Sequence, residues 1–104
     1  MATTTKTMAR TAAATSNTTL YTVPNSSTTA IVTNIVATNT AASAATFTIN
    51  IDSVALLSGV SLAANSSAFF DLKQVIPANA TPKTISGSAS ATTVNFHISG
   101  VEIA

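Results

Sequence analysis

The chain consists of short segments in which apolar residues alternate with small polar ones, with turn-prone residues roughly every ten positions. The clearest is ATFTINID (45–52), where Phe47, Ile49 and Ile51 fall on one side of an extended backbone. Such alternation is typical of a half-buried β-strand. About eight such segments predict an all-β chain, folded as an antiparallel β-sandwich or a jelly roll.

The segment TTAIVTNIVATNT (28–40) is apolar on both faces of an extended chain. This pattern predicts either a strand that is covered on both sides or a strand with a bulge. Simple alternation places its apolar residues on two faces: Ile31 and Ile35 on one, Val32 and Val36 on the other.

Two later segments are less regular. SAFFDLKQVIP (67–77) fits helical and strand spacing, and its β-rich surroundings favour a strand through Leu72 followed by a helical turn before Pro77. KTISGS (83–88) predicts a weak strand.

The last segment begins at about Thr92 and contains the only histidine. Its apolar positions change phase by one residue, from Val94, Phe96 and Ile98 to Val101 and Ile103. Because glycine tolerates the positive φ of some bulges, we predict a β-bulge at Gly100. All five apolar side chains should then be buried, and His97 and Glu102 should both point outward.

Residues 1–16 contain no aromatic or large branched residue and hold two of the four cations, Lys6 and Arg10. They predict an extended, flexible N-terminal arm, leaving the β-sandwich domain at residues 17–104. The arm is either a disordered end or a segment that becomes ordered on a neighbouring subunit. Its deletion should leave the fold intact and weaken assembly.

Only 7% of the residues are charged, against about 25% in ordinary soluble domains. The polarity comes instead from 20 Thr, 13 Ser and 8 Asn. So few charges favour association between molecules. Four cations make no basic stripe, and no apolar run approaches the ~18 residues of a membrane span. We therefore expect neither nucleic acid nor membrane as a partner.

An enzyme needs reactive groups that converge, and few are present: Asp52, Asp71, Glu102, His97 and a single tyrosine. The sequence has no nucleophile elbow, no paired histidines, no glycine-rich phosphate loop and no cysteine. We therefore expect no catalytic, metal or cofactor site. Asp71 and Lys73 share a face of a strand, which predicts an exposed ion pair.

Several phrases resemble small virion proteins of tailed bacteriophages, including phages of aquatic bacteria and cyanobacteria. These phrases are LYTVP and TAIVTNI within 20–35, NTAASAATFTI (39–49), FFDLKQVI (69–76) and VNFHISGVEI (94–103). The resemblance covers residues 20–103 and leaves the N-terminal arm outside. It implies a β-sandwich that decorates or cements the capsid, and it carries over no catalytic residues.

The resemblance also implies partners and a location. Capsid cement proteins of this kind sit as homotrimers on the shell, where they brace the major capsid protein. The chain would then be found in the virion, on the capsid surface or tail, after assembly in the host cytoplasm. The interface residues we expect are Lys6, Arg10, His97 and Glu102. Alternatives are a tail, neck or fibre-attachment component and a carbohydrate-binding β-sandwich on a virion appendage.

Overall fold

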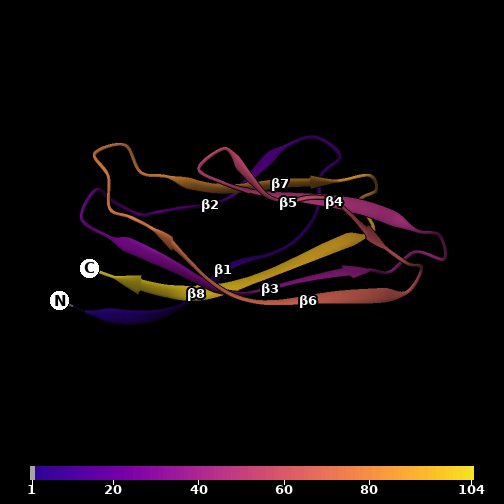
Figure 1. Cartoon of the computed structure of the whole chain (residues 1–104), viewed down its shortest axis with the longest axis horizontal. Coiled ribbons are helices and arrows are strands. Elements are labelled where there is room, and N and C mark those ends of the chain that lie inside the picture. Colours follow the sequence, from indigo (N-terminus) through magenta and orange to yellow (C-terminus); the bar gives the residue numbers. More distant parts are fainter. Residues whose placement is uncertain (1) are drawn as a thin grey trace.

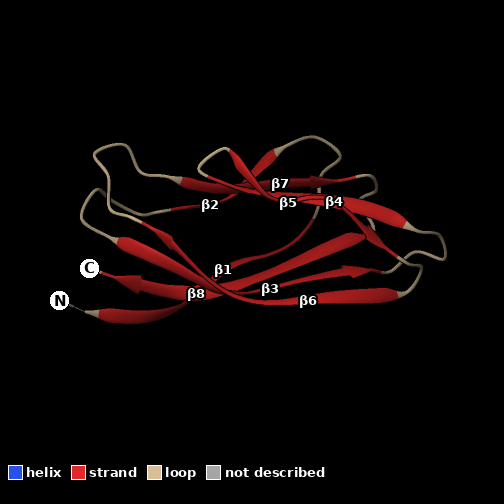
Figure 2. Cartoon of the chain, viewed as in Figure 1, coloured by secondary structure: helices blue, strands red, loops and turns tan. Residues whose placement is uncertain are grey.

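The computed structural model describes residues 2–104 as two four-stranded antiparallel sheets packed face to face (Figure 1). Figure 2 shows strands and connecting loops over this range, and the described residues include no helix that could cross a membrane. The predicted all-β sandwich is confirmed. Its strands are β1 (Thr3–Ala12), β2 (Thr18–Thr22), β3 (Thr29–Asn39), β4 (Ala45–Ile51), β5 (Val54–Leu62), β6 (Ser66–Ile76), β7 (Thr84–Ala89) and β8 (Val94–Ile103).

The strand order is β1-β8-β3-β6 in one sheet, called sheet A, and β2-β7-β4-β5 in the other, called sheet B. The first strand pairs with the last, the second with the seventh, the third with the sixth and the fourth with the fifth. This is a long hairpin that turns between β4 and β5 and is rolled so that its arms alternate between the sheets. Eight strands so arranged in two sheets are a jelly roll.

The core lies between the inner faces of the two sheets. Phe47 of sheet B packs edge-to-face against Phe96 and Phe70 of sheet A, with ring centroids 5.8 and 6.1 Å apart. Both Phe47 and Phe96 are fully buried. Edge-to-face pairs add about 0.5–1.5 kcal/mol each to the free energy from burial. The aromatic contacts therefore join the middle of sheet A to the middle of sheet B.

The last strand, β8, runs from Val94 to Ile103 without the bulge predicted at Gly100. The register shifts lie in its neighbours instead, between Thr7 and Ala9 of β1 and between Val32 and Asn34 of β3. Side chains of β8 therefore alternate throughout. The predicted burial is confirmed for the first three apolar residues and wrong for the last two, which are half-buried: Val101 and Ile103.

A bulge also resolves the apolar pattern of residues 28–40. The register of β3 shifts around Thr33, so that Val32 and Ile35 both point into the core. The predicted bulge is confirmed, but the predicted pairing of Ile31 with Ile35 on one face is wrong, because the extra residue reverses the alternation.

Two other segments differ from their predictions. β6 continues as a strand to Ile76, so the expected helical turn before Pro77 is absent; pairing with β3 extends to that residue. The segment expected to form a weak strand is β7, which lies inside sheet B and pairs with β2 and β4. Its apolar side chains are few, and hydrogen bonding on both edges maintains it.

Residues 3–12, assigned from the sequence to a flexible arm, form the edge strand β1. β1 pairs with β8 over its whole length, and Ala2 and Ala104 exchange backbone hydrogen bonds of 2.9 Å at its end. Met8 and Ala9 of this strand are buried in the core. The composition of the segment was misleading because a Thr-rich strand needs few apolar side chains when its backbone is paired.

Candidate interaction surface

His97 and Glu102 lie on opposite faces of sheet A and form no common site. Residues five positions apart in an unbulged strand point in opposite directions. His97 is exposed on the outer face, as predicted from the sequence, whereas Glu102 points between the sheets. The outward prediction for Glu102 is wrong because it depended on a bulge at Gly100.

Glu102 accepts a hydrogen bond from the hydroxyl of Tyr21, which belongs to β2 in the opposite sheet. Tyr21 is buried. Burial raises the pKa of Tyr21 well above its usual range, and the hydrogen bond and negative charge of Glu102 shift it in the same direction. The pair therefore links the two sheets and keeps the phenol protonated, which is a structural task.

The charged side chains are spread over separate elements. No three His, Cys, Asp or Glu residues within 2–104 are grouped closely enough to hold a metal ion. The predicted pairing of Asp71 with Lys73 is wrong: Asp71 instead accepts a hydrogen bond of 3.3 Å from the Asn34 amide. Asp71 and Lys73 are both exposed, with half-buried Leu72 between them, so the shared face is as predicted and only the ion pair is wrong.

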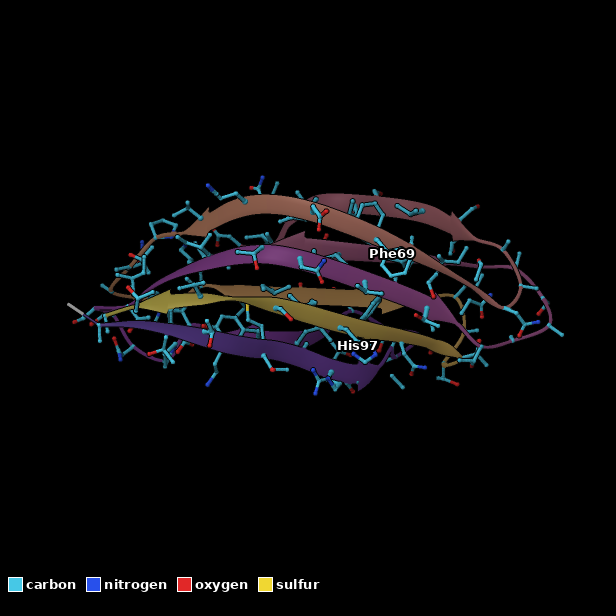
Figure 3. The ribbon with its side chains drawn as sticks, turned by 90° about the horizontal axis from the view of Figure 1, so that it is seen from below. Phe69 and His97 are labelled. Carbon is cyan, nitrogen blue, oxygen red and sulfur yellow. The ribbon has the colours of Figure 1, made fainter. Side chains whose placement is uncertain are left out.

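Figure 3 looks onto the outer face of sheet A, where His97 and Phe69 are labelled. The pairing register arranges side chains of this face in rows that cross all four strands. Residues directly opposite one another on neighbouring strands share a face. Written from β1 to β6, the first row is Arg10, His97, Val36 and Phe69; the second is Thr7, Ser99, Asn34 and Asp71; the third is Thr5, Val101, Ile31 and Val75.

This outer face is unusually apolar for an uncovered surface. Phe69 is 73% exposed and Val75 is 55% exposed, both on β6. Ile31, Val36 and Val101 lie beside them and are half-buried. The polar second row separates Val36 and Phe69 from the other three, so the face carries two apolar clusters, and exposed apolar clusters on a small protein mark sites of interaction.

The outer face of sheet B has a different chemistry. Along β4 it presents Thr46, Thr48 and Asn50, and the residues opposite two of these are Ser61 of β5 and Ser88 of β7. Hydroxyl and amide groups hydrogen-bond readily to water. Of the three largely exposed apolar side chains among residues 2–104, two, Phe69 and Val75, belong to sheet A and one, Val54, to sheet B, so more apolar area is left in water on sheet A.

A shallow hollow of about 340 Å³ lies on the outer face of sheet A, over β8 and between β1 and β3. It forms because the residue on β8 at its floor is the small Ser99. The predicted interface residue Lys6 borders it, and the predicted interface residue Arg10 lies on the same strand, exposed beside His97. Three of the four predicted interface residues are therefore exposed on β1 and β8, and Glu102 is not.

The sequence contained a signal for the exposed Phe69 that the sequence reasoning missed. In a strand, Phe69 has the same parity as Asp71, so it shares the face of a charged residue. A phenylalanine on the same face of the strand as an aspartate points away from the core. Phe70, with the opposite parity, is the one that reaches Phe47.

Comparison with known proteins gives likeness of fold alone. No family model matches the chain, and no curated protein sequence matches it. One similar solved chain is from the structure of infectious bursal disease virus Gx strain, with a TM-score of 0.53, 18% identity and 98% of this chain covered. A second, from the crystal structure of the T13 IBDV viral particle, has a TM-score of 0.56, 13% identity and 97% coverage.

The chain spans about a third of the length of those two chains, 32% and 30% respectively. At this identity the match concerns the path of the backbone and no particular side chain. The jelly roll of this protein is thus an architecture also found in chains of a virus particle.

Proposed function

We propose that this chain is a structural protein of a bacteriophage virion, and that it acts as a capsid decoration or cement protein. The observation that carries the proposal is the apolar outer face of sheet A on a jelly-roll fold similar to chains of a virus particle. A decoration protein needs a rigid scaffold and an exposed surface through which it binds the shell or further copies of itself. Its binding to the shell surface would stabilise the shell.

The partners in this proposal are the major capsid protein and further copies of the same chain. The bacteriophage resemblance of the sequence implies a homotrimer on the shell. Because few of the exposed groups are charged, such contacts would depend little on salt concentration. The chain would occupy the host cytoplasm during assembly and the virion afterwards.

Copy number tests this function. Particles that contain the chain are purified on a density gradient, and the chain is quantified against the major shell subunit by mass spectrometry with isotope-labelled peptides. We expect hundreds of copies per particle, and image reconstruction should place them at lattice symmetry points. Particles free of the chain would overturn the proposal.

A handful of copies at one vertex would instead support a tail, neck or fibre-attachment component. That alternative uses the same fold and the same apolar face, so only location and number separate it from capsid decoration.

A carbohydrate-binding appendage is the second alternative. Sugar binding usually relies on exposed aromatic rings, and Phe69 is the largely exposed one among residues 2–104. Binding of the recombinant chain to a glycan array would favour this alternative, and loss of that binding in Phe69→Ala would assign it to sheet A.

The proposal includes a non-enzymatic role for His97. Virions that carry His97→Ala should assemble with normal yield and normal occupancy, because the imidazole is exposed and belongs to no group of His, Cys, Asp or Glu among residues 2–104 that could hold a metal ion. A loss of particle assembly with intact folding would contradict this.

A further inference from the structure

We infer that the outer face of sheet A binds the same face of a second copy of this chain, related by a two-fold axis parallel to the strands. The inference goes beyond the proposed function and does not depend on where in a particle the chain resides. It predicts a dimer in solution in place of the homotrimer that the bacteriophage resemblance implies. It rests on the order of side chains in the three rows, because most positions of a row are matched in chemistry when the row faces a second copy of itself in the opposite order.

A two-fold axis along the strands, midway between β8 and β3, lays β1 over the partner's β6 and β8 over the partner's β3. Each row then faces itself in the opposite order. In the first row Arg10 lies over the aromatic ring of the partner's Phe69, and the contact occurs twice. A guanidinium over an aromatic face is a favourable cation–π arrangement.

The other two rows match in the same way. In the second, Ser99 faces the partner's Asn34, and Thr7 can donate a hydrogen bond to the partner's Asp71. In the third, Val101 packs against the partner's Ile31. Four of the six distinct pairs are thus complementary, whereas His97 faces the partner's Val36 and Thr5 faces the partner's Val75. Lys73, exposed on β6 between Asp71 and Val75, comes opposite uncharged Thr side chains of the partner's β1.

A two-fold axis perpendicular to the strands would bring Phe69 over the partner's Val75, but it sets charges of the same sign against each other. It keeps each strand over its own copy and inverts the order of the rows about the second row. Asp71 would then face the partner's Asp71, and the Asn34 and Ser99 row would lie on itself. Arg10 would face a threonine in place of an aromatic ring. Like charges in contact disfavour this arrangement.

The size of the face suits a second copy. Four strands about 4.8 Å apart and about ten residues long, at roughly 3.3 Å per residue, span about 19 by 33 Å. That is roughly 600 Å² in projection, and relief of the side chains raises the accessible area toward the ~800 Å² per partner of a standard interface. Two sheets that pack aligned, about 10 Å apart, would form a four-layer sandwich.

The test is the mass of the purified full-length chain in solution, measured by sedimentation equilibrium over a wide range of concentrations. We expect twice the 10.4 kDa mass of the chain. Phe69→Lys places a cation opposite the partner's Arg10 and should weaken the dimer about 100-fold or more, since each substitution acts at two equivalent contacts. Val54→Lys is the matched control: Val54 is 68% exposed but lies on β5 in sheet B, and the dimer should be unchanged.

The decisive variant is Arg10→Glu combined with Phe69→Lys, which should restore dimerisation. Residues 10 and 69 lie on opposite edges of sheet A, so the restoring ion pair can form only between two copies. Circular dichroism and thermal melting check that each variant is folded.

A monomer at all concentrations, a trimer, or a dimer unaffected by Phe69→Lys would overturn the inference. A monomer whose binding to shells is abolished by Phe69→Lys would also overturn it, because the shell protein would then be the occupant. Failure of the inference in solution leaves the copy-number test of the virion role unaffected, and the reverse also holds.

Discussion

Gly100 offers the sharpest test of the packing between the bulges of β1 and β3. A Cβ atom at this position would lie 2.5 Å from Met8 Cε and 2.9 Å from Met8 Sδ, and it would also clash with the carbonyl oxygen of Ile31. The end of the methionine side chain can move aside. The Ile31 oxygen cannot, because it belongs to the backbone of β3 in the middle of sheet A.

We therefore expect Gly100→Ala to destabilise the fold by about 3 kcal/mol. Overpacking of a core costs about 1–3 kcal/mol, and displacement of the Ile31 carbonyl weakens ladder hydrogen bonds worth about 1 kcal/mol each. For a domain of this size, 3 kcal/mol corresponds to a fall in Tm of about 12–24 °C. Urea denaturation, followed by circular dichroism and the fluorescence of the single tyrosine, measures the loss.

Gly59→Ala is the matched control, because nothing lies within 4 Å of the added methyl group. Gly59 has a φ of +56°, so this variant loses only about 1–2 kcal/mol through backbone strain. Combining Gly100→Ala with Met8→Ala should recover little of the loss, since the backbone clash remains. A Gly100→Ala variant within 1 kcal/mol of wild type, or one rescued by Met8→Ala, would refute the reasoning.

Three further predictions concern other parts of the fold. Because the pKa of Tyr21 is raised in the folded protein, the stabilising effect of Tyr21 is complete below about pH 10 and is lost as the pH rises above that value, so Tm should fall there. Tyr21→Phe should flatten this fall in Tm. Ultraviolet titration should show the folded phenol ionising at a higher pH than the urea-unfolded phenol, and coincident titrations would contradict the prediction. Asn39→Asp should lower the free energy of unfolding by about 2–4 kcal/mol, as measured by denaturant unfolding. The buried amide donates hydrogen bonds to the carbonyls of Ser43 at 2.8 Å and Ala63 at 3.3 Å, which a carboxylate cannot do. An unchanged unfolding midpoint would disprove this role. Deletion of residues 2–12 should lower Tm by exposing the edge of β8 and part of the core, and an unchanged Tm would restore the sequence-based expectation of a dispensable arm.

The strands and their inward side chains could largely be predicted from the sequence. Alternation identified Phe47 and Ile49 correctly, and Val94, Phe96 and Ile98 are all buried. Each of these segments has one apolar face, so a single strand contains enough information to orient itself.

The errors arose where orientation depends on a neighbouring strand. The phase change near Gly100 looked like a bulge in β8, yet the extra residues lie in β1 and β3, which the sequence of β8 cannot reveal. Glu102 was therefore assigned to the wrong face, and its contact with Tyr21 was missed. For the candidate surface, Arg10 and His97 were predicted as outward interface residues, but their place in a row with Val36 and Phe69 depends on pairing across four strands.

The sequence by itself determined that the chain forms a β-sandwich, because alternating apolar residues can be buried only when two sheets face each other. It also determined that reactive chemistry is scarce, since that is a matter of composition. Only the tertiary structure decided which outer face is apolar. Strand order and register bring side chains from β1, β3, β6 and β8 into common rows, and residues so far apart in sequence acquire a shared surface only through that pairing.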